Sequence, residues 1–180
     1  MLAVALLSGC TTTSSTKAKS LKATTSGATS LSECENITVF AFGIPAKSSA
    51  AASTGVDFAR DIQNRLGHDF GPIFQSVEFG DKARGVEKEC LVTGDITKYK
   101  PGSRVARFIL IGLGAASFQG NVVVVDAASQ KQLLNAPFSK LWAWGGIAGA
   151  SKGIEDMVKE SAAAVASTLA QAKGWTPPAK

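Results

Sequence analysis

The residues best suited to nucleophilic, metal or general-base chemistry are three cysteines and one histidine. Cys10, Cys34 and Cys90 show no CxxC spacing, so the patterns typical of zinc sites and thioredoxin-like redox sites are absent. His68 lies next to Asp69, but no GxSxG nucleophile elbow accompanies this pair. We expect His68 to complement the dipole at the C-terminal end of a helix.

Two other patterns indicate chemistry only weakly. Asp57 and Asp61 are spaced for one face of a helix, but without a third ligand they favour a solvated face over a metal site. The motif at 112–114 begins like a dinucleotide-binding loop, yet Ser117 takes the place of its third glycine and "NVVVV" follows instead of a helix. The sequence therefore predicts no catalytic residues, no metal and no cofactor, and a protein that is not an enzyme.

Cys10 stands between an apolar run and a polar tract. Leu7-Ser8-Gly9-Cys10 matches the four positions of a bacterial lipobox, where a signal peptide is cut and the cysteine receives acyl chains such as palmitate. We therefore predict a signal peptide over 1–9, truncated because its apolar run is short and no Lys or Arg precedes it. Thr11, where Asp would favour retention at the inner membrane, indicates the outer membrane facing the periplasm.

Residues 10–31 form a Ser/Thr-rich tract that contains Lys17, Lys19 and Lys22. Such a tract has too few apolar residues to fold alone, so we expect a disordered tether. The net charge of +5 comes partly from these lysines, and no Lys/Arg stripe interleaved with aromatic residues indicates a nucleic-acid partner. The expected partners are the membrane, through the lipid on Cys10, and an envelope protein or polysaccharide.

The remaining chain is predicted to fold as one domain over 32–174, followed by a tail over 175–180. Helices are expected at 54–66 and 154–172, where apolar residues recur on one helical face. Strands are expected at 36–42, 73–79 and 90–100, and as a strand, glycine-rich turn, strand, turn and strand over 107–144. This order predicts an α+β fold, a mainly antiparallel sheet of five to six strands with two helices packed on one face.

Three segments of this domain carry further predictions. Residues 81–89, "DKARGVEKE", are expected to form an exposed charged connection, and Pro137 indicates an edge or a bulge in the last strand. Residues 108–125 carry no charge, but their central Gly, Ser and Asn residues favour a strand hairpin over a membrane helix. Alternatively, this glycine-rich hairpin could meet the membrane in a pore or secretion complex.

Trp142 and Trp144 lie two residues apart on a predicted strand, so they point the same way. They could form an aromatic contact patch that binds a partner or stacks on a sugar. The alternative is that they pack in the core or beneath a helix, as aromatic strand residues usually do.

Cys34 and Cys90 are the two thiols that remain if Cys10 is lipidated. In an oxidising compartment, an even number of cysteines suggests a disulfide. If the strands that begin after Cys34 and at Cys90 are parallel neighbours, the two residues stand at the same edge of the sheet, within disulfide range. The alternative is two unpaired cysteines, one in the tether and one buried.

The segment from about Cys90 to Trp142 resembles the DUF4410 family of bacterial lipoproteins. The resemblance rests on "LVTGDITKYKPGS", Arg107, "IGLGAAS" and "NVVVVDAASQKQLL", with Gln130 departing from the glycine usual in that turn. The family implies no assigned activity, and a looser similarity to the soluble domain of the curli-secretion lipoprotein concerns the fold alone. The expected function is a non-enzymatic cell-envelope lipoprotein that acts as a binding or assembly module. The alternative is a subunit of an outer-membrane pore or secretion complex.

Overall fold

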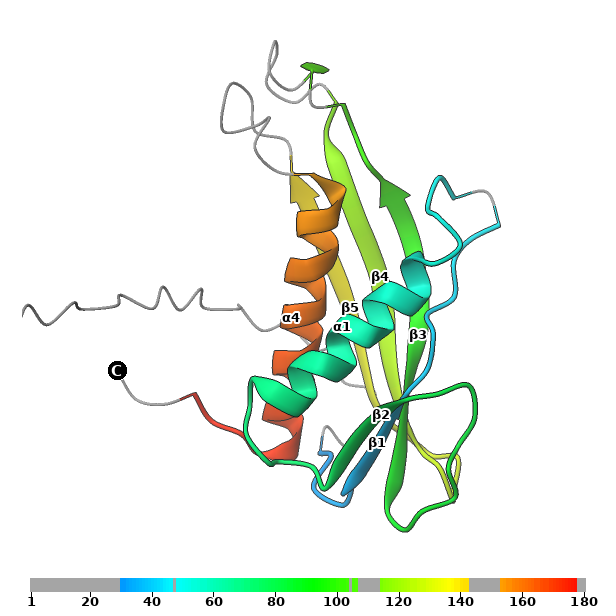
Figure 1. Cartoon of the computed structure of the whole chain (residues 1–180), viewed down its shortest axis with the longest axis vertical. Coiled ribbons are helices and arrows are strands. Elements are labelled where there is room, and N and C mark those ends of the chain that lie inside the picture. The colour runs from blue at the N-terminus through cyan, green and yellow to red at the C-terminus, as the bar shows by residue number, and fades with distance from the viewer. Residues whose placement is uncertain (1–29, 47, 104, 107–113, 143–152, 178–180) are drawn as a thin grey trace, which may run out of the picture.

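The structure is a computed structural model that describes residues 30–177, except 47, 104, 107–113 and 143–152. Five strands form one sheet in the order β2-β1-β3-β4-β5 (Figure 1). The elements in chain order are β1 (Asn36–Val39), α1 (Thr54–His68), β2 (Ser76–Phe79), β3 (Glu89–Lys100), β4 (Ala116–Asp126), β5 (Gln132–Trp142) and α4 (Ile154–Lys173). The additional strand expected near 107–111 lies outside the described residues.

The sheet is mixed, and its antiparallel part is the larger. β1 lies between β2 and β3 and runs parallel to both, with Ile37 opposite Val77 on one side and Cys90 on the other. β3, β4 and β5 form an antiparallel meander whose ladders are more than twice as long as those of β1. The α+β class is therefore confirmed, with parallel pairing around β1 as an addition to the predicted sheet.

The two described helices cover one face of the sheet (Figure 1). α1 contacts β1 and β2, α4 contacts β4 and β5, and the two helices contact one another. Along β4 the side chains alternate, and those facing the helices are buried: Ala116, Phe118, Gly120, Val122 and Val124. This period of two is what a strand with one covered face requires.

A cluster of four phenylalanines fills the space between α1 and the sheet. Phe58 of α1 makes edge-on or tilted ring contacts with Phe42, Phe118 and Phe138, with centroids 4.9 to 5.2 Å apart. Phe58 belongs to the predicted apolar stripe of α1, whose members are buried. Such aromatic pairs add roughly 0.5–1.5 kcal/mol each to the effect of burial, so this cluster helps to hold α1 on the sheet.

The glycine-rich turn predicted within 107–144 does not include Gly120, because β4 already begins at Ala116. A Cβ atom on Gly120 would lie 2.3 Å from Cζ of Phe138 and 2.4 Å from the backbone oxygen of Asp95. Glycine inside a strand commonly marks such a close approach. Gly120 is therefore a packing residue of β4, and the glycine with a turn conformation is Gly114, at φ +70°.

β5 pairs with β4 alone among the described strands, which confirms the prediction that Pro137 marks an edge. Pro137 stands near the middle of this strand, opposite Asn121. Because proline has no backbone N–H, it interrupts the donors that an exposed edge would offer to another strand.

The connection between β2 and β3, residues 80–88, is a crossover loop. β2 and β3 flank β1 and run parallel to it, so this loop has to pass over β1 to reach the start of β3. Its Arg84 donates a hydrogen bond to Thr38, whose side chain alternates with the core-facing Ile37 and Val39. The loop therefore covers β1 on the back face, defined here as the sheet face turned away from the helices.

Candidate functional site

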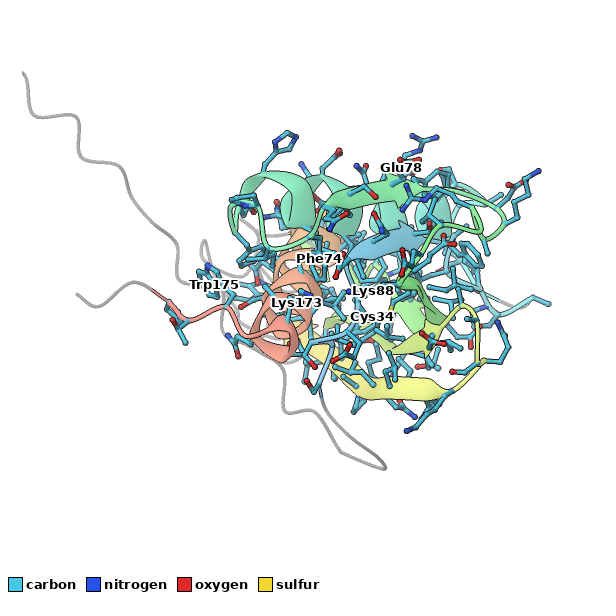
Figure 2. The ribbon with its side chains drawn as sticks, turned by 90° about the horizontal axis from the view of Figure 1, so that it is seen from below. Cys34, Phe74, Glu78, Lys88, Lys173 and Trp175 are labelled. Carbon is cyan, nitrogen blue, oxygen red and sulfur yellow. A yellow bond between two sulfur atoms is a disulfide. The ribbon has the colours of Figure 1, made fainter. Side chains whose placement is uncertain are left out.

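The N-terminal segment enters the domain at the C-terminal end of α4. Leu31 is fully buried, and its backbone N–H donates a 2.9 Å hydrogen bond to the carbonyl of Ala172. The Nζ of Lys173 donates a 2.8 Å hydrogen bond to the carbonyl of Ser32. In Figure 2, Lys173 and Cys34 lie at this same end of the molecule. We call residues 31–34 the entry segment.

A disulfide joins the entry segment to the sheet. Cys34 is bonded to Cys90, with Cα atoms 5.6 Å apart, and both residues are buried. Cys90 is the second residue of β3 and lies opposite Ile37 in the parallel ladder of β1 and β3. The condition stated from the sequence, parallel neighbouring strands, is thus met, and the entry segment is covalently fixed to the third strand of the sheet.

Glu89 is the one buried carboxylate among the described residues. Its Oε1 accepts hydrogen bonds from the hydroxyl of Thr38 at 2.5 Å and from the backbone N–H of Arg84 at 3.0 Å. Its Oε2 accepts one from the backbone N–H of Gly85 at 2.9 Å. The expectation that 81–89 is exposed is therefore wrong for Glu89, because the crossover loop folds back onto this carboxylate.

The side chain of Arg84 ties the crossover loop to two strands. Its Nε donates to the hydroxyl of Thr38 at 3.0 Å and lies 3.6 Å from Oε1 of Glu89. Its Nη1 lies 2.6 Å from Oε1 of Glu78, and its Nη2 donates to the hydroxyl of Ser76 at 2.9 Å. Because each of these polar groups already has a partner, the arrangement is suited to holding the loop in place rather than to binding a substrate.

Several opposing effects set the pKa of Glu89. Burial raises the pKa of this carboxyl, but the hydrogen bonds from Arg84, Thr38 and Gly85, together with the charge of Arg84, outweigh burial and leave the pKa below its ordinary value. The folded protein therefore holds the proton more weakly than the unfolded chain does.

We expect the free energy of unfolding to fall in acid as Glu89 becomes protonated. The contribution is fully present above the unfolded pKa of roughly 4.3, and it is lost as pH falls through the lower pKa of the folded state. Urea unfolding between pH 7 and pH 2 measures this slope, and Glu89→Gln should flatten it. Asp126→Asn is the comparison variant, because a hydrogen bond from the Ser129 hydroxyl also lowers the pKa of Asp126. An unchanged slope in Glu89→Gln would contradict the assignment.

The other predicted site residues are not brought together. Cys10 and Trp144 lie outside the described residues. Trp142 is half-buried and packs against the hydrophobic core, so a contact patch that includes both tryptophans stays a prediction. His68 is the exposed last residue of α1.

Asp57 and Asp61 line a hollow of about 240 Å³ between the helices and Tyr99. Asp61 also forms an ion pair with Arg65 on its own helix, with Nε and Oδ1 3.0 Å apart. The described part of the chain holds no group of three or more His, Cys, Asp or Glu side chains that could bind a metal ion. Within the same residues, no helix is both long enough and apolar enough to cross a membrane.

The fold is similar to those of bacterial proteins whose structures have been solved. PelC from Paraburkholderia phytofirmans, solved as a dodecamer, superposes with a TM-score of 0.59 and 16% identity over 81% of this chain and 95% of that one. A second PelC dodecamer, of a variant protein, gives 0.56 and 14% over 79% and 92%. Protein XCC0632 from Xanthomonas campestris, of the DUF330 family, gives 0.52 and 8% over 77% and 85%. At these identities the similarity establishes the fold alone.

Comparisons of sequence give one assignment. No curated protein matches the chain in sequence. The family described as "Domain of unknown function (DUF4410)" matches residues 46–146, which is more than half of the chain and runs from the loop before α1 past the end of β5. The chain therefore belongs to the DUF4410 family.

Proposed function

We propose that this protein is a cell-envelope lipoprotein, a periplasmic domain held to the outer membrane by a lipid on Cys10. The observation that carries the proposal is the lipobox at Leu7 to Cys10, followed by a polar tract that leads to the entry segment. Leu31 and Cys34, at the two ends of the entry segment, are buried, and Cys34 is cross-linked to the sheet, so a pull on the tether acts on a firmly held point. Nineteen residues lie between Cys10 and Ser30, and this stretch spans at most about 70 Å when fully extended.

The role proposed for the tethered domain is binding or assembly, without catalysis and without a cofactor. Support comes from the cluster of polar residues around Arg84 and the buried Glu89, which is occupied by its own hydrogen bonds. The proposed partners are the membrane and a protein or polysaccharide of the envelope.

Cys10→Ser is expected to release the protein from the membrane, because the lipid is attached to this sulfur. The measurement is metabolic labelling with a palmitate analogue, combined with membrane fractionation, and both labelling and sedimentation should be lost. Thr12→Ser, outside the four lipobox positions, should keep both. A Cys10→Ser protein that still sediments with membranes would contradict the lipid anchor.

A substitution at Thr11, the residue after Cys10, tests whether the protein is anchored in the outer or the inner membrane. Thr11→Asp should move the protein from the outer-membrane to the inner-membrane fraction while labelling persists. An unchanged distribution would contradict the outer-membrane assignment and leave the anchor itself intact.

A second candidate is a subunit of a multi-copy complex, such as an outer-membrane pore or secretion complex. Residues 116–125 of the proposed membrane-contacting hairpin form most of β4, which is paired on both sides within the sheet, and this weighs against that role. A different feature favours assembly: no described helix lies over the back face of β3 to β5 (Figure 1). This surface carries the partly exposed Leu91, Val123 and Val125, and the 66% exposed Leu141. The similarly folded PelC is described as a dodecamer.

Assembly through the back face predicts a mass above that of one chain. We expect native mass spectrometry of the lipid-free Cys10→Ser protein to show oligomers that Leu141→Glu reduces, because a carboxylate would be buried without a partner in the contact. Asn64→Glu, on the exposed side of α1, is the matched control and should leave the mass unchanged. A single-chain mass at all concentrations would remove this candidate.

A further inference from the structure

We propose that the Cys34–Cys90 disulfide transfers tension from the tether directly to the middle of the sheet, so that β1 is shielded from being pulled out. The inference rests on the proposed anchor at Cys10, because a domain anchored by its N-terminal tether is pulled through Ser30. Inside the domain, the proposed force path runs through residues that the structure describes.

The contacts that precede the disulfide are few and non-covalent. Leu31 is held by burial and by its hydrogen bond to Ala172, and Ser32 by its hydrogen bond from Lys173. If these contacts yield, tension passes along the entry segment to Cys34 within two residues. Without a cross-link, the next structure to resist would be β1.

β1 is poorly suited to resist tension by itself. It has four residues, and its ladders to β2 and β3 each contain four residue pairs. Because β1 lies between these two strands, its extraction would divide the sheet into β2 and the β3–β5 meander. It would also remove Ile37 and Val39 from the core and leave Glu89 without the Thr38 hydroxyl. A failure of this short strand would therefore open the domain.

The disulfide diverts the force before it reaches β1. From Cys34 the covalent path runs to Cys90 on β3, which has twelve residues and a ladder to β4 that extends from Cys90 to Lys100. Both sulfur-bearing residues are nearly inaccessible to solvent, at 0% and 2% exposure. Dissolved thiols therefore have poor access to the bond in the folded state. With the disulfide intact, tension can straighten the entry segment, but it cannot extend the chain further until the ladder between β3 and β4 breaks.

A single-molecule pulling experiment tests this path. In the chain from Cys10 to Lys180, Cys10 is the one thiol outside the disulfide and takes one handle, and a peptide tag after Lys180 takes the other. The oxidised protein is compared with the Cys34→Ala/Cys90→Ala variant. We expect the variant to show an early short extension, as residues 31–39 leave the fold, and a lower force for the main unfolding event. An identical first event in both proteins would overturn the proposal.

The matched control separates force transfer from general stabilisation. Handles are placed on Ala128→Cys, in the exposed turn between β4 and β5, and on the C-terminus, in a Cys10→Ser background, so that the disulfide lies off the direct path. Loss of the disulfide should then lower the unfolding force by a smaller fraction than with the handle on Cys10. Equal fractional losses in the two geometries would mean that the bond is only a general stabiliser. These measurements use lipid-free protein, so a failure of lipid labelling would be a separate result.

Discussion

Loss of the Cys34–Cys90 disulfide is expected to lower the free energy of unfolding by roughly 4 kcal/mol. The two cysteines are 56 residues apart in sequence, so the bond removes many conformations from the unfolded chain. Urea unfolding of the Cys34→Ala/Cys90→Ala variant against the oxidised protein gives this difference. The reduced wild-type protein, which keeps both side chains, separates the cross-link from the volume lost on substitution.

The control for this prediction is Cys10→Ser, which alters the third cysteine and should leave the unfolding curve unchanged. A difference of less than about 1 kcal/mol between the oxidised protein and the double variant would contradict the expected role. It would indicate that the unfolded chain keeps residual structure that holds the two residues close together.

Arg84→Ala is expected to lower the free energy of unfolding by about 3 kcal/mol, the lower end of the range for breaking a buried ion pair. The lower end applies because the Arg84 side chain is 21% exposed and its Nε is 3.6 Å from the Glu89 carboxylate. The substitution leaves Glu89 buried with its negative charge and also frees the crossover loop from Glu78 and Ser76. Thermal and urea unfolding measure the loss.

Two further variants sharpen this test. Arg84→Ala/Glu89→Gln should regain part of the loss, because it removes the uncompensated charge. Arg65→Ala, which breaks partly exposed ion pairs with Asp61 of α1 and with Asp69 just after α1, should cost less than about 1 kcal/mol. If Arg84→Ala costs no more than Arg65→Ala, then solvent screens the Arg84 guanidinium and the backbone donors alone stabilise the carboxylate.

The elements that the sequence predicted well are those with a strong local pattern. Phe58, Ile62 and Leu66 recur every four residues, and this pattern predicted α1. The helix begins at Thr54, as expected, and ends at His68. The run before Pro101 predicted β3 to within one residue of its start. The periodicity of the apolar residues and the residues that end a helix or strand were enough to predict α1 and β3. Knowledge of their neighbours in space was not needed.

The features that the sequence did not predict depend on contacts between distant segments. "DKARGVEKE" has the composition of an exposed connection, and only the passage of the crossover loop over β1 turns Glu89 into a buried group. Gly120 belongs to a segment whose glycines suggest a turn. Its actual role, which is to let Phe138 of the neighbouring strand pack closely against β4, depends on a contact that the local sequence does not reveal. A charged or glycine-rich stretch carries no local signal for such partners, which come from the strand order.

The strand order also suggests which strand pairs form early in folding and which form late. β4 and β5 are joined by a short turn and can associate by closing a few residues, whereas α1, β2 and the crossover loop separate β1 from β3 along the chain. Closing the longer loop costs more chain entropy, and such non-local contacts slow folding. The strand nearest the N-terminus is thus expected to be the last to enter the sheet. Pulse-labelled hydrogen exchange should protect the amides of β4 before those of β1, and the reverse order would contradict this sequence of events.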